Sequence, residues 1–365
     1  MLGKTAGGLF WMFRYIERCE NTARLLDAGW RISLTRTGED EWESVINTAG
    51  IRFLYEEKFQ DFEARNVINF LLRDGDNPSS VLSAIGLARS NARLVRTALS
   101  AEVWEAVNEY WMTMKALLAR PVTEKNLAQV LAEIRNRTAI VRGTLHGTML
   151  RNDIYNFCRL GTFLERADNT ARILDVKYYV LLPSASFVGS SVDNTQWENI
   201  LRSVGAERSF TWLHGGDPTP SAMADFLILD RRMPRSLAFC HGKIQENLAL
   251  LENEYGSRLP CQDQAETCVA RFRDRAVVDV FDEGLHEYLE SSIHETAMLA
   301  SQIEQDFRFY GQAHDSEYFP RIHIYLRQPR FLRPAPTAAK TPRWPRPTGT
   351  TMGHPDRRCH AAAEL

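Results

Sequence analysis

The chain reads Glu17-Arg-Cys-Glu-Asn-Thr-Ala-Arg-Leu-Leu-Asp27 near its start and Glu165-Arg-Ala-Asp-Asn-Thr-Ala-Arg-Ile-Leu-Asp175 a further 148 residues along (165 − 17). The two copies are identical at 8 of 11 positions, and the other three are mild exchanges. A repeat this sharp concerns architecture first. It predicts that the two stretches occupy equivalent helices in two related parts of the chain. It does not name a reaction.

Other landmarks recur at nearly the same spacing. They are residues 42–46 and 197–201 (197 − 42 = 155), Pro78 and Pro234 (234 − 78 = 156), and Asn91 and Asn247 (247 − 91 = 156). Chance is a poor explanation for several landmarks at one spacing, and the period is far above that of solenoid repeats. We therefore predict an internal duplication, with halves of about 1–120 and 152–312 packed around a pseudo-twofold axis.

Helical periodicity dominates up to about residue 312. Residues 5–31 carry an apolar stripe at steps of three and four, with Thr5 as a plausible N-cap. The stripe consists of Met12, Ile16, Cys19, Ala23, Leu26 and Trp30. Further helices are predicted over residues 42–46, 104–119, 126–149, 241–254 and 279–310, with Pro78 and Pro234 at helix starts and loops at 183–189 and 215–220. The predicted fold class is an all-α helical bundle, in one domain of residues 1–312.

The last stretch, residues 318–365, has a different composition. It is rich in Pro and Arg and has almost no periodicity, so we predict a disordered tail. Alternating residues at 321–326 are too few and too isolated to build a sheet on. The tail has no block of consecutive charges, so nucleic-acid binding is not expected. An out-of-frame reading of GC-rich DNA is the sharper alternative.

The bulk composition is that of an ordinary globular protein, with 44% hydrophobic residues, 25% charged residues and a formal net charge of −2. This balance gives no argument for nucleic acid or a membrane as partner. The 6 cysteines show no CxxC spacing and are expected to be reduced thiols. We expect no signal peptide, because Arg14 and Glu17 interrupt the short apolar run 7–13, and no membrane span, hence a cytoplasmic protein.

Several motifs together resemble one family. They are Gly8-Leu9-Phe10-Trp11-Met12-Phe13-Arg14-Tyr15-Ile16-Glu17-Arg18 continuing through Glu20-Asn21-Thr22-Ala23-Arg24, then Ala88-Arg89-Ser90-Asn91-Ala92-Arg93, Trp104-Glu105, Leu229-Asp230 and Pro234-Arg235-Ser236. With the second Glu165-Arg166 pair, they resemble the bacterial alpha-E family, a helical domain named for its Glu-Arg motif. The resemblance covers about Met1 to Gln312.

The resemblance implies a role but no reaction. The family has no established activity, and its members resemble accessory proteins of peptide-ligation gene clusters. The neighbours there include circularly permuted ATP-grasp ligases, transglutaminase-like proteases and sometimes a proteasome-like peptidase. We therefore expect an accessory or ligand-binding partner of an ATP-grasp-type peptide ligase, and we expect no cofactor. Whether the chain is itself an enzyme stays open.

The repeated motif supplies the candidate site. Its polar residues are Glu17, Arg18, Asn21, Arg24, Glu165, Arg166, Asn169 and Arg172. In one interpretation they form a polar seam, in which two facing helices lock their register through buried ion pairs. In the other they line a cleft, where the guanidinium groups hold carboxylate or phosphate and the glutamates act as base or metal ligand. If the motif is a seam, replacing both Arg24 and Arg172 by Ala is expected to unfold the protein. If it lines a cleft, the same change is expected to leave stability nearly intact and to abolish function.

A third hypothesis is a metal site. Glu283 and His286 have the Glu-x-x-His spacing of helical di-iron proteins, and Glu290 and His294 could add a ligand pair. No second Glu-x-x-His is present, so a solvated helix face is the preferred interpretation and no metal is predicted. Two weaker catalytic candidates are His146 alone and the pair Cys240 and His241, which are adjacent in the sequence. GxxxxGK[ST], GxGxxG, HExxH and GxSxG are absent, so this chain alone is not expected to be an ATP-dependent ligase.

Overall fold

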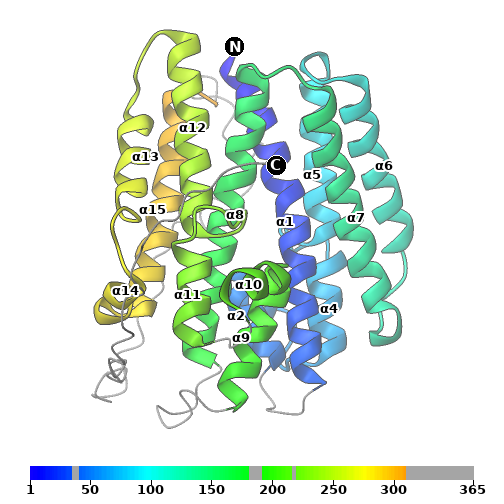
Figure 1. The fold of residues 1–365 in the computed structure, drawn as a ribbon. Helices are drawn as coiled ribbons and strands as arrows, with labels where there is room; N and C mark the ends of the chain where they lie inside the picture. Colours follow the sequence, from blue (N-terminus) through cyan, green and yellow to red (C-terminus); the bar gives the residue numbers. More distant parts are fainter. Residues whose placement is uncertain (35–40, 181–190, 216–218, 310–365) are drawn as a thin grey trace, which may run out of the picture. The chain divides into compact units, whose positions relative to one another are not determined.

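The computed structural model describes residues 1–34, 41–180, 191–215 and 219–309. Of two compact units, Met1–Pro329 and Arg330–Leu365, only the first contains described residues. In this part of the chain all regular structure is helical, so the all-α prediction is confirmed (Figure 1). The predicted tail 318–365, the segment 321–326, the loop 183–189 and residues 216–218 of the loop 215–220 lie outside the described residues.

The helices follow one another through short connections. They are α1 Gly3–Ser33, α2 Glu41–Ala49, α3 Arg52–Glu56, α4 Ala64–Arg73, α5 Val81–Leu94, the 3₁₀ turn η1 Arg96–Ala98, α6 Ala101–Leu117, α7 Glu124–Thr148, α8 Asp153–Val180, α9 Ser191–Ser203, α10 Glu207–His214, α11 Pro220–Ile228, α12 Leu237–Tyr255, α13 Pro260–Ala270, α14 Val277–Glu283 and α15 Leu285–Asp306. None of the described helices combines the length and the apolar character that crossing a bilayer requires.

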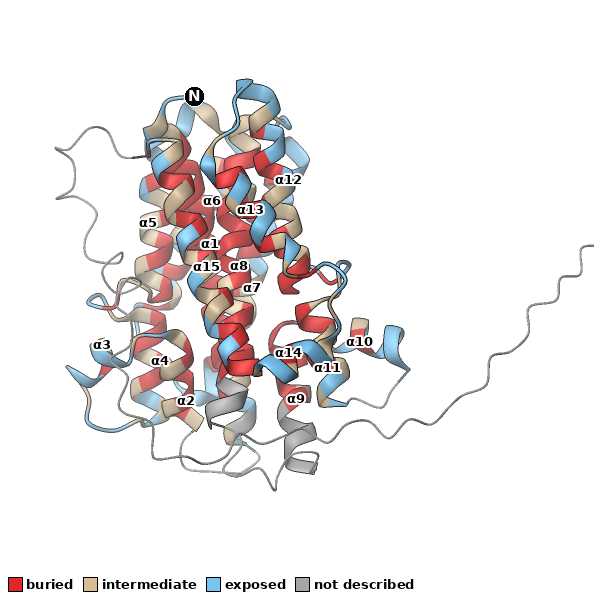
Figure 2. Cartoon of the chain, turned by 90° about the vertical axis from the view of Figure 1, so that its left-hand side faces the viewer, coloured by how far each residue is buried: buried red, intermediate tan, exposed pale blue. Residues whose placement is uncertain are grey.

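Helices α1 and α8, which carry the two motif copies, pack along each other. Helix α1 also contacts α5, α7, α2 and α9, while α8 contacts α12, α15 and α2 (Figure 1). The remaining long helices extend this arrangement through the pairs α5–α6, α6–α7, α12–α13 and α13–α15. The motif stretches therefore lie at the centre of the packing, each surrounded by other helices (Figure 2).

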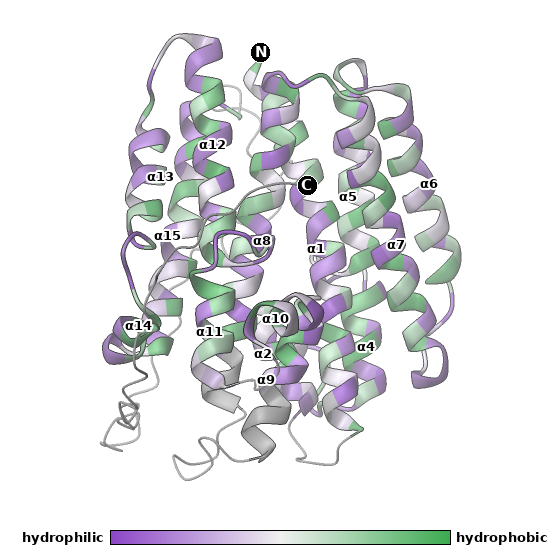
Figure 3. Cartoon of the chain, viewed as in Figure 1, coloured by the Kyte–Doolittle hydropathy of each residue, from purple (hydrophilic) through white to green (hydrophobic). Residues whose placement is uncertain are grey.

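Helix α1 is buried on more than its apolar side. The predicted stripe is in the core from Met12 to Leu26, and Trp30 is partly buried at its end. The opposite polar face is buried as well, with Glu17 and Glu20 each only 1% exposed. Figure 3 accordingly shows hydrophilic positions on α1 among the hydrophobic ones. An amphipathic pattern ordinarily places its polar face in water. Here α8 covers that face instead.

Two hydrophobic clusters form the core. Trp42 belongs to the larger cluster and Trp197 to the smaller one, so these two equivalent positions of the repeat are both core residues. The predicted helices over residues 104–119, 126–149 and 241–254 correspond to α6, α7 and α12, with ends shifted by a few residues. Such shifts are normal for helix termini.

Three predicted helix starts were wrong. Helix α1 begins at Gly3, so Thr5 lies inside its first turn and is not the N-cap. Pro78 and Pro234 each lie two residues before an N-cap serine rather than in the first turn. The hydroxyl of Ser80 accepts from Ser83 N at 3.2 Å, and that of Ser236 accepts from Phe239 N at 3.0 Å. Serine is favoured at the N-cap because its oxygen satisfies a free backbone N–H.

The long helix predicted over residues 279–310 is broken. Helix α14 ends at Glu283 and α15 begins at Leu285, because Gly284 has φ 101°. A residue with a Cβ rarely adopts that conformation, and glycine adopts it at little cost. Glu283 and His286 therefore belong to different helices, and the helical Glu-x-x-His spacing does not exist in the fold.

One glycine brings the two central helices into backbone contact. A Cβ on Gly161 of α8 would overlap the carbonyl oxygen of Phe10 in α1 and would lie 3.2 Å from the backbone nitrogen of Arg14. The absence of a side chain at this position therefore allows the close approach of α8 to α1. That approach brings the motif side chains of the two helices within hydrogen-bond distance of each other.

Candidate functional site

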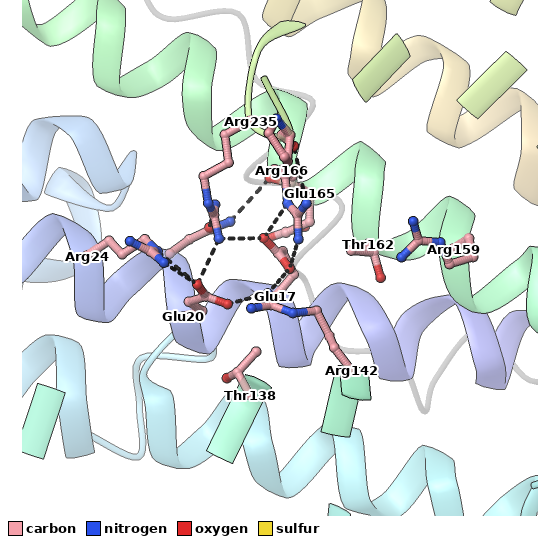
Figure 4. A network of polar contacts seen from close by, with 12 residues as sticks. Glu17, Glu20, Arg24, Thr138, Arg142, Arg159, Thr162, Glu165, Arg166 and Arg235 are labelled. Carbon is pink, nitrogen blue, oxygen red and sulfur yellow. Dashed lines mark hydrogen bonds and ion pairs between the residues drawn. The ribbon is translucent and has the colours of Figure 1, made fainter. Parts of the chain in front are cut away.

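Glu17 is the centre of a buried polar network. Its carboxylate accepts from Arg166 at 2.8 and 3.0 Å and from Arg142 at 3.0 Å, and it pairs with Arg235 at 3.1 Å (Figure 4). Burial alone would raise the pKa of Glu17, but the charges of Arg166, Arg235 and Arg142 outweigh it and hold the pKa well below its usual range. Glu17 is therefore a carboxylate at any physiological pH.

Glu165 holds the reciprocal position on α8. It accepts two hydrogen bonds from Arg18, at 2.5 and 3.0 Å, and one from Arg14 at 2.9 Å. Burial opposes ionisation, yet Arg18 and Arg14 lower the pKa of Glu165 to about 2. The two Glu-Arg pairs thus exchange partners across the helix contact: Arg18 binds Glu165, and Arg166 binds Glu17. Two-pronged guanidinium–carboxylate contacts of this kind fix geometry as well as charge.

The other motif arginines stay on their own helices. Arg24 donates to Glu20 at 2.9 Å and Arg172 to Asp168 at 2.8 Å, and both are ion pairs at spacing i, i+4. Arg24 and Arg172 do not contact the opposite motif. Glu20 also binds Arg235 at 2.9 Å, together with Arg142 of α7.

The two motif asparagines have unequal surroundings. Asn21 donates to the backbone oxygen of Glu165 at 3.3 Å, and its own oxygen accepts from Arg235 at 3.1 Å. The buried Nδ2 of Asn169, by contrast, has no hydrogen-bond partner among the described residues. The residue aligned with Arg235 at the offset of 156 is Ser79, whose short side chain carries no guanidinium. The network is therefore complete around Asn21 only.

Three arginines of the network were missed by sequence reasoning. Arg14 gave a signal, since it interrupts an apolar run. Arg235 lies in the Pro-Arg-Ser motif that carried the family resemblance, but its contact with Glu20 spans 215 residues. Arg142 gave no signal in the sequence, because the sequence of α7 is that of an ordinary polar helix. A contact between residues this far apart in the chain depends on the tertiary fold, which local patterns do not specify.

The network has more arginines than carboxylates. Six arginines (Arg14, Arg18, Arg24, Arg142, Arg166 and Arg235) contact three carboxylates (Glu17, Glu20 and Glu165), a formal surplus of three positive charges. Burial lowers the pKa of Arg235 to about 10, and the nearby Arg166 adds to this effect. Every carboxylate is engaged by at least two arginines. The arrangement therefore offers no free general base at the motif.

The residues of the metal hypothesis have other partners. Glu283 pairs with Arg275, and His286 Nδ1 lies 2.5 Å from Asp175 Oδ1, with Nε2 3.4 Å from Glu290. The burial of His286 opposes protonation, but the hydrogen bond to Asp175 raises its pKa overall. Across the described ranges, no three or more His, Cys, Asp or Glu side chains gather in a way that could hold a metal ion.

Cys240 and His241 do not form a nucleophile–base pair. Burial raises the pKa of the Cys240 thiol to about 12, and its Sγ lies 3.8 Å from the oxygen of Pro234. His241 points elsewhere, with Nε2 3.3 Å from the hydroxyl of Thr296. His146 binds Tyr155 OH through Nδ1 at 2.7 Å and lies 3.0 Å from an Arg159 nitrogen through Nε2. Each candidate thus has a structural contact and no reacting partner.

His241 is expected to make the protein acid-sensitive. Its Nδ1 is buried and has no hydrogen-bond partner in the described part of the chain, and burial lowers its pKa to about 4, against about 6.5 in an unfolded chain. The folded pKa is the lower one, so this contribution to stability is full above pH 6.5 and is lost as the pH falls toward 4. The total loss is about 3 kcal/mol.

Chemical denaturation of wild type and His241→Asn from pH 7 to pH 4 measures this effect. The variant should lose less stability over that range than wild type, because the new side chain does not titrate. His294→Asn, at an exposed position of α15, is the matched control and should keep the wild-type slope. Equal slopes for all three proteins would contradict the assignment.

The fold and the site together define a class of protein: it is all-helical, and its centre is a buried network of glutamates and arginines. Residues 1–307 match the family Alpha-E, described as a predicted alpha-helical domain with a conserved ER motif, and the chain belongs to that family. A search of curated proteins and a search of solved structures each gave no match.

Proposed function

We propose that this chain is a non-catalytic accessory protein that binds an ATP-grasp-type peptide ligase in the bacterial cytoplasm. The non-catalytic role is supported by one observation, the ionisation and the arginine contacts of the motif carboxylates. Glu17, Glu20 and Glu165 are ionised and each is bound by at least two arginines. A general base must be free to take a proton at its working pH, and these groups are not. The ligase and a transglutaminase-like protease as partners rest on the family resemblance alone.

In this proposal the motif is a seam that fixes α1 against α8. An internal duplication accounts for the exchange of partners between Glu17–Arg166 and Arg18–Glu165. It also accounts for a second correspondence, which involves two glycines at the offset of 155. Gly205, with φ 69°, would place a Cβ 3.1 Å from Arg24 Nη1, and Gly50, with φ 70°, would place one 3.2 Å from Arg172 Nη1. Both arginines therefore pack against a left-handed glycine on the other half.

The enzyme alternative has less support. It requires a cleft in which the motif arginines and glutamates face a substrate. Arg18 and Arg166 are instead engaged with glutamates of the opposite helix, and Glu17 and Glu165 are almost fully buried. Breaking these pairs to admit a substrate would leave charges buried without partners, which costs several kcal/mol. We therefore favour a role in binding and assembly.

Affinity capture of the full chain from its native bacterium tests the proposal. We expect an ATP-grasp-type ligase to be recovered in near-equal amounts and to co-migrate with the chain on size exclusion. A second capture with Gly161→Ala, which is designed to separate α1 from α8, should lose that ligase. Recovery of the chain as a monomer without a ligase would contradict the partnership.

A further inference from the structure

A hollow lies where the C-terminal part of α1 meets the corner between α9 and α10. Its volume is about 420 Å³, within the range of roughly 300–1,000 Å³ that is usual for small-molecule sites. It is lined by Asp27, Arg31, Arg202, Gly205, Glu207 and Arg208. Five of these six residues are charged, so the hollow differs from the apolar cavities that packing leaves in a core.

Arginines outnumber carboxylates around the hollow. Arg31 binds Asp27 at 3.2 Å, and Arg202 binds Glu207 at 3.0 Å and pairs with Glu198 at 3.6 Å. Arg208 is exposed and makes no ion pair within the described part of the chain. A fourth arginine, Arg135 of α7, reaches Asp27 at 3.9 Å. Four guanidinium groups thus share three acidic partners, Asp27, Glu198 and Glu207, which leaves a formal surplus of one positive charge in a concave site.

The motif lies directly behind this hollow. Arg24 donates through Nη1 to the backbone oxygen of Ser203 at 3.2 Å, two residues before the lining glycine Gly205. Burial lowers the pKa of Arg135, and Arg24 acts in the same direction against Asp27. The corresponding aspartate of the second copy, Asp175, is instead buried against His286. The first copy of the motif therefore adjoins a charged hollow, whereas the aspartate of the second copy pairs with a histidine.

Helix α10, which supplies Glu207 and Arg208 to the hollow, also carries an exposed aromatic ring one turn further along. Trp212 is 83% exposed and follows Arg208 by four residues on α10, so the two share one face of that helix. The opposite face is anchored by Phe210, which is buried and stacks on His214 with ring centroids 4.6 Å apart. A tryptophan left in water beside an arginine offers a flat surface to a bound molecule.

We propose that this hollow binds a small polyanion, whose carboxylate or phosphate groups pair with Arg31, Arg202 and Arg208. Guanidinium groups suit both chemistries because their planar N–H forks match either oxyanion. Several anionic groups on one ligand fit better than one, because the arginines come from two separate elements, α1 and the α9–α10 corner. The site goes beyond the accessory role proposed above, and it is tested on the purified chain without any ligase.

Titration calorimetry of the full chain tests this site with three probes. Triglutamate carries carboxylates, tripolyphosphate carries phosphates, and triglutamine has the size of the first probe with one carboxylate. We expect triglutamate or tripolyphosphate to bind and triglutamine to bind at least ten-fold more weakly. The stronger of the two anions identifies the source of the charge. Binding should weaken as salt is raised, because the contacts are exposed.

Two variants give opposite expected shifts. Arg208→Gln should weaken the anion at least ten-fold, and it should fold normally because the side chain is exposed and makes no ion pair in the described structure. Glu207→Gln removes one of the competing carboxylates of Arg202 and should strengthen binding several-fold. Arg93→Gln, at an exposed position of α5, is the matched control and should change nothing. The proposal is overturned if neither anion binds, if triglutamine binds equally well, or if Arg208→Gln leaves the affinity unchanged.

Discussion

Replacing Glu17 by Gln should destabilise the folded protein by about 3–5 kcal/mol, the usual result of removing one partner from a buried ion pair. The amide nearly preserves the shape of the side chain but removes the charge that faces Arg142, Arg166 and Arg235. These guanidinium groups would remain buried, with Glu20 as their nearest carboxylate. Chemical denaturation of the full chain at pH 7 measures the change, which should appear as a lower midpoint at an unchanged slope.

A surface pair provides the matched control. Glu246 is largely exposed and binds Lys243 at spacing i, i+3, so Glu246→Gln should change stability by less than about 0.5 kcal/mol. Combining Glu17→Gln with Arg166→Gln should cost less than the sum of the single variants, because the second change removes one of the unpaired charges. A free energy of unfolding of Glu17→Gln within 1 kcal/mol of the wild-type value would show that the network contributes little to the stability of the fold.

Gly161→Ala should destabilise the protein by about 3 kcal/mol, at the upper end for an overpacked position. The added methyl group would overlap the Phe10 carbonyl, which belongs to the backbone of α1 and has no rotamer to change. Relief therefore requires α8 to move away from α1, which lengthens the contacts Arg18–Glu165 and Arg166–Glu17 together. Thermal and chemical denaturation both report this loss.

Another helical glycine gives the opposite expectation. A Cβ on Gly143, in α7, meets no atom within 4 Å. Gly143→Ala should therefore stabilise the protein by roughly 0.5–1 kcal/mol, the usual gain from removing a glycine inside a helix. The contrast between the two variants isolates the helix contact from helix propensity. A Gly161→Ala protein as stable as Gly143→Ala would show that the two backbones do not touch.

Much of the helical framework follows from local pattern. The stripe from Met12 to Leu26 predicts α1 because steps of three and four place those side chains on one face. The same periodicity does not say what covers the other face of the helix, so the sequence leaves a buried seam and an open cleft as alternatives. Only the fold shows that Glu17 is covered by α8. The break at Gly284 could not be predicted either, because the presence of a glycine does not show that its φ will be 101° and that one helix will end and the next begin there.

The sequence predicted which residues belong to the site better than it predicted which of them bind each other. The repeated motif singled out Glu17 and Arg166, and these residues are in contact. The expectation that Arg24→Ala with Arg172→Ala unfolds a seam placed the cross-helix contacts on the wrong arginines. Arg24 and Arg172 bind carboxylates of their own helices and are about one-fifth exposed, so their loss should be milder than that of Arg18 or Arg166. Which arginine reaches the opposite helix depends on how α1 and α8 pack, and the motif alone does not specify that packing.

The burial of α1 has a consequence for synthesis on the ribosome. Helix α1 is made well before its partners Arg142, Arg166 and Arg235, which lie 122 to 215 residues later in the chain. Until they emerge, Glu17 and Glu20 remain in water and α1 has no permanent neighbours on that face. Domains with such distant contacts assemble late and expose apolar surface meanwhile. We therefore expect the nascent N-terminal half to keep apolar surface exposed until the second half of the chain has been made.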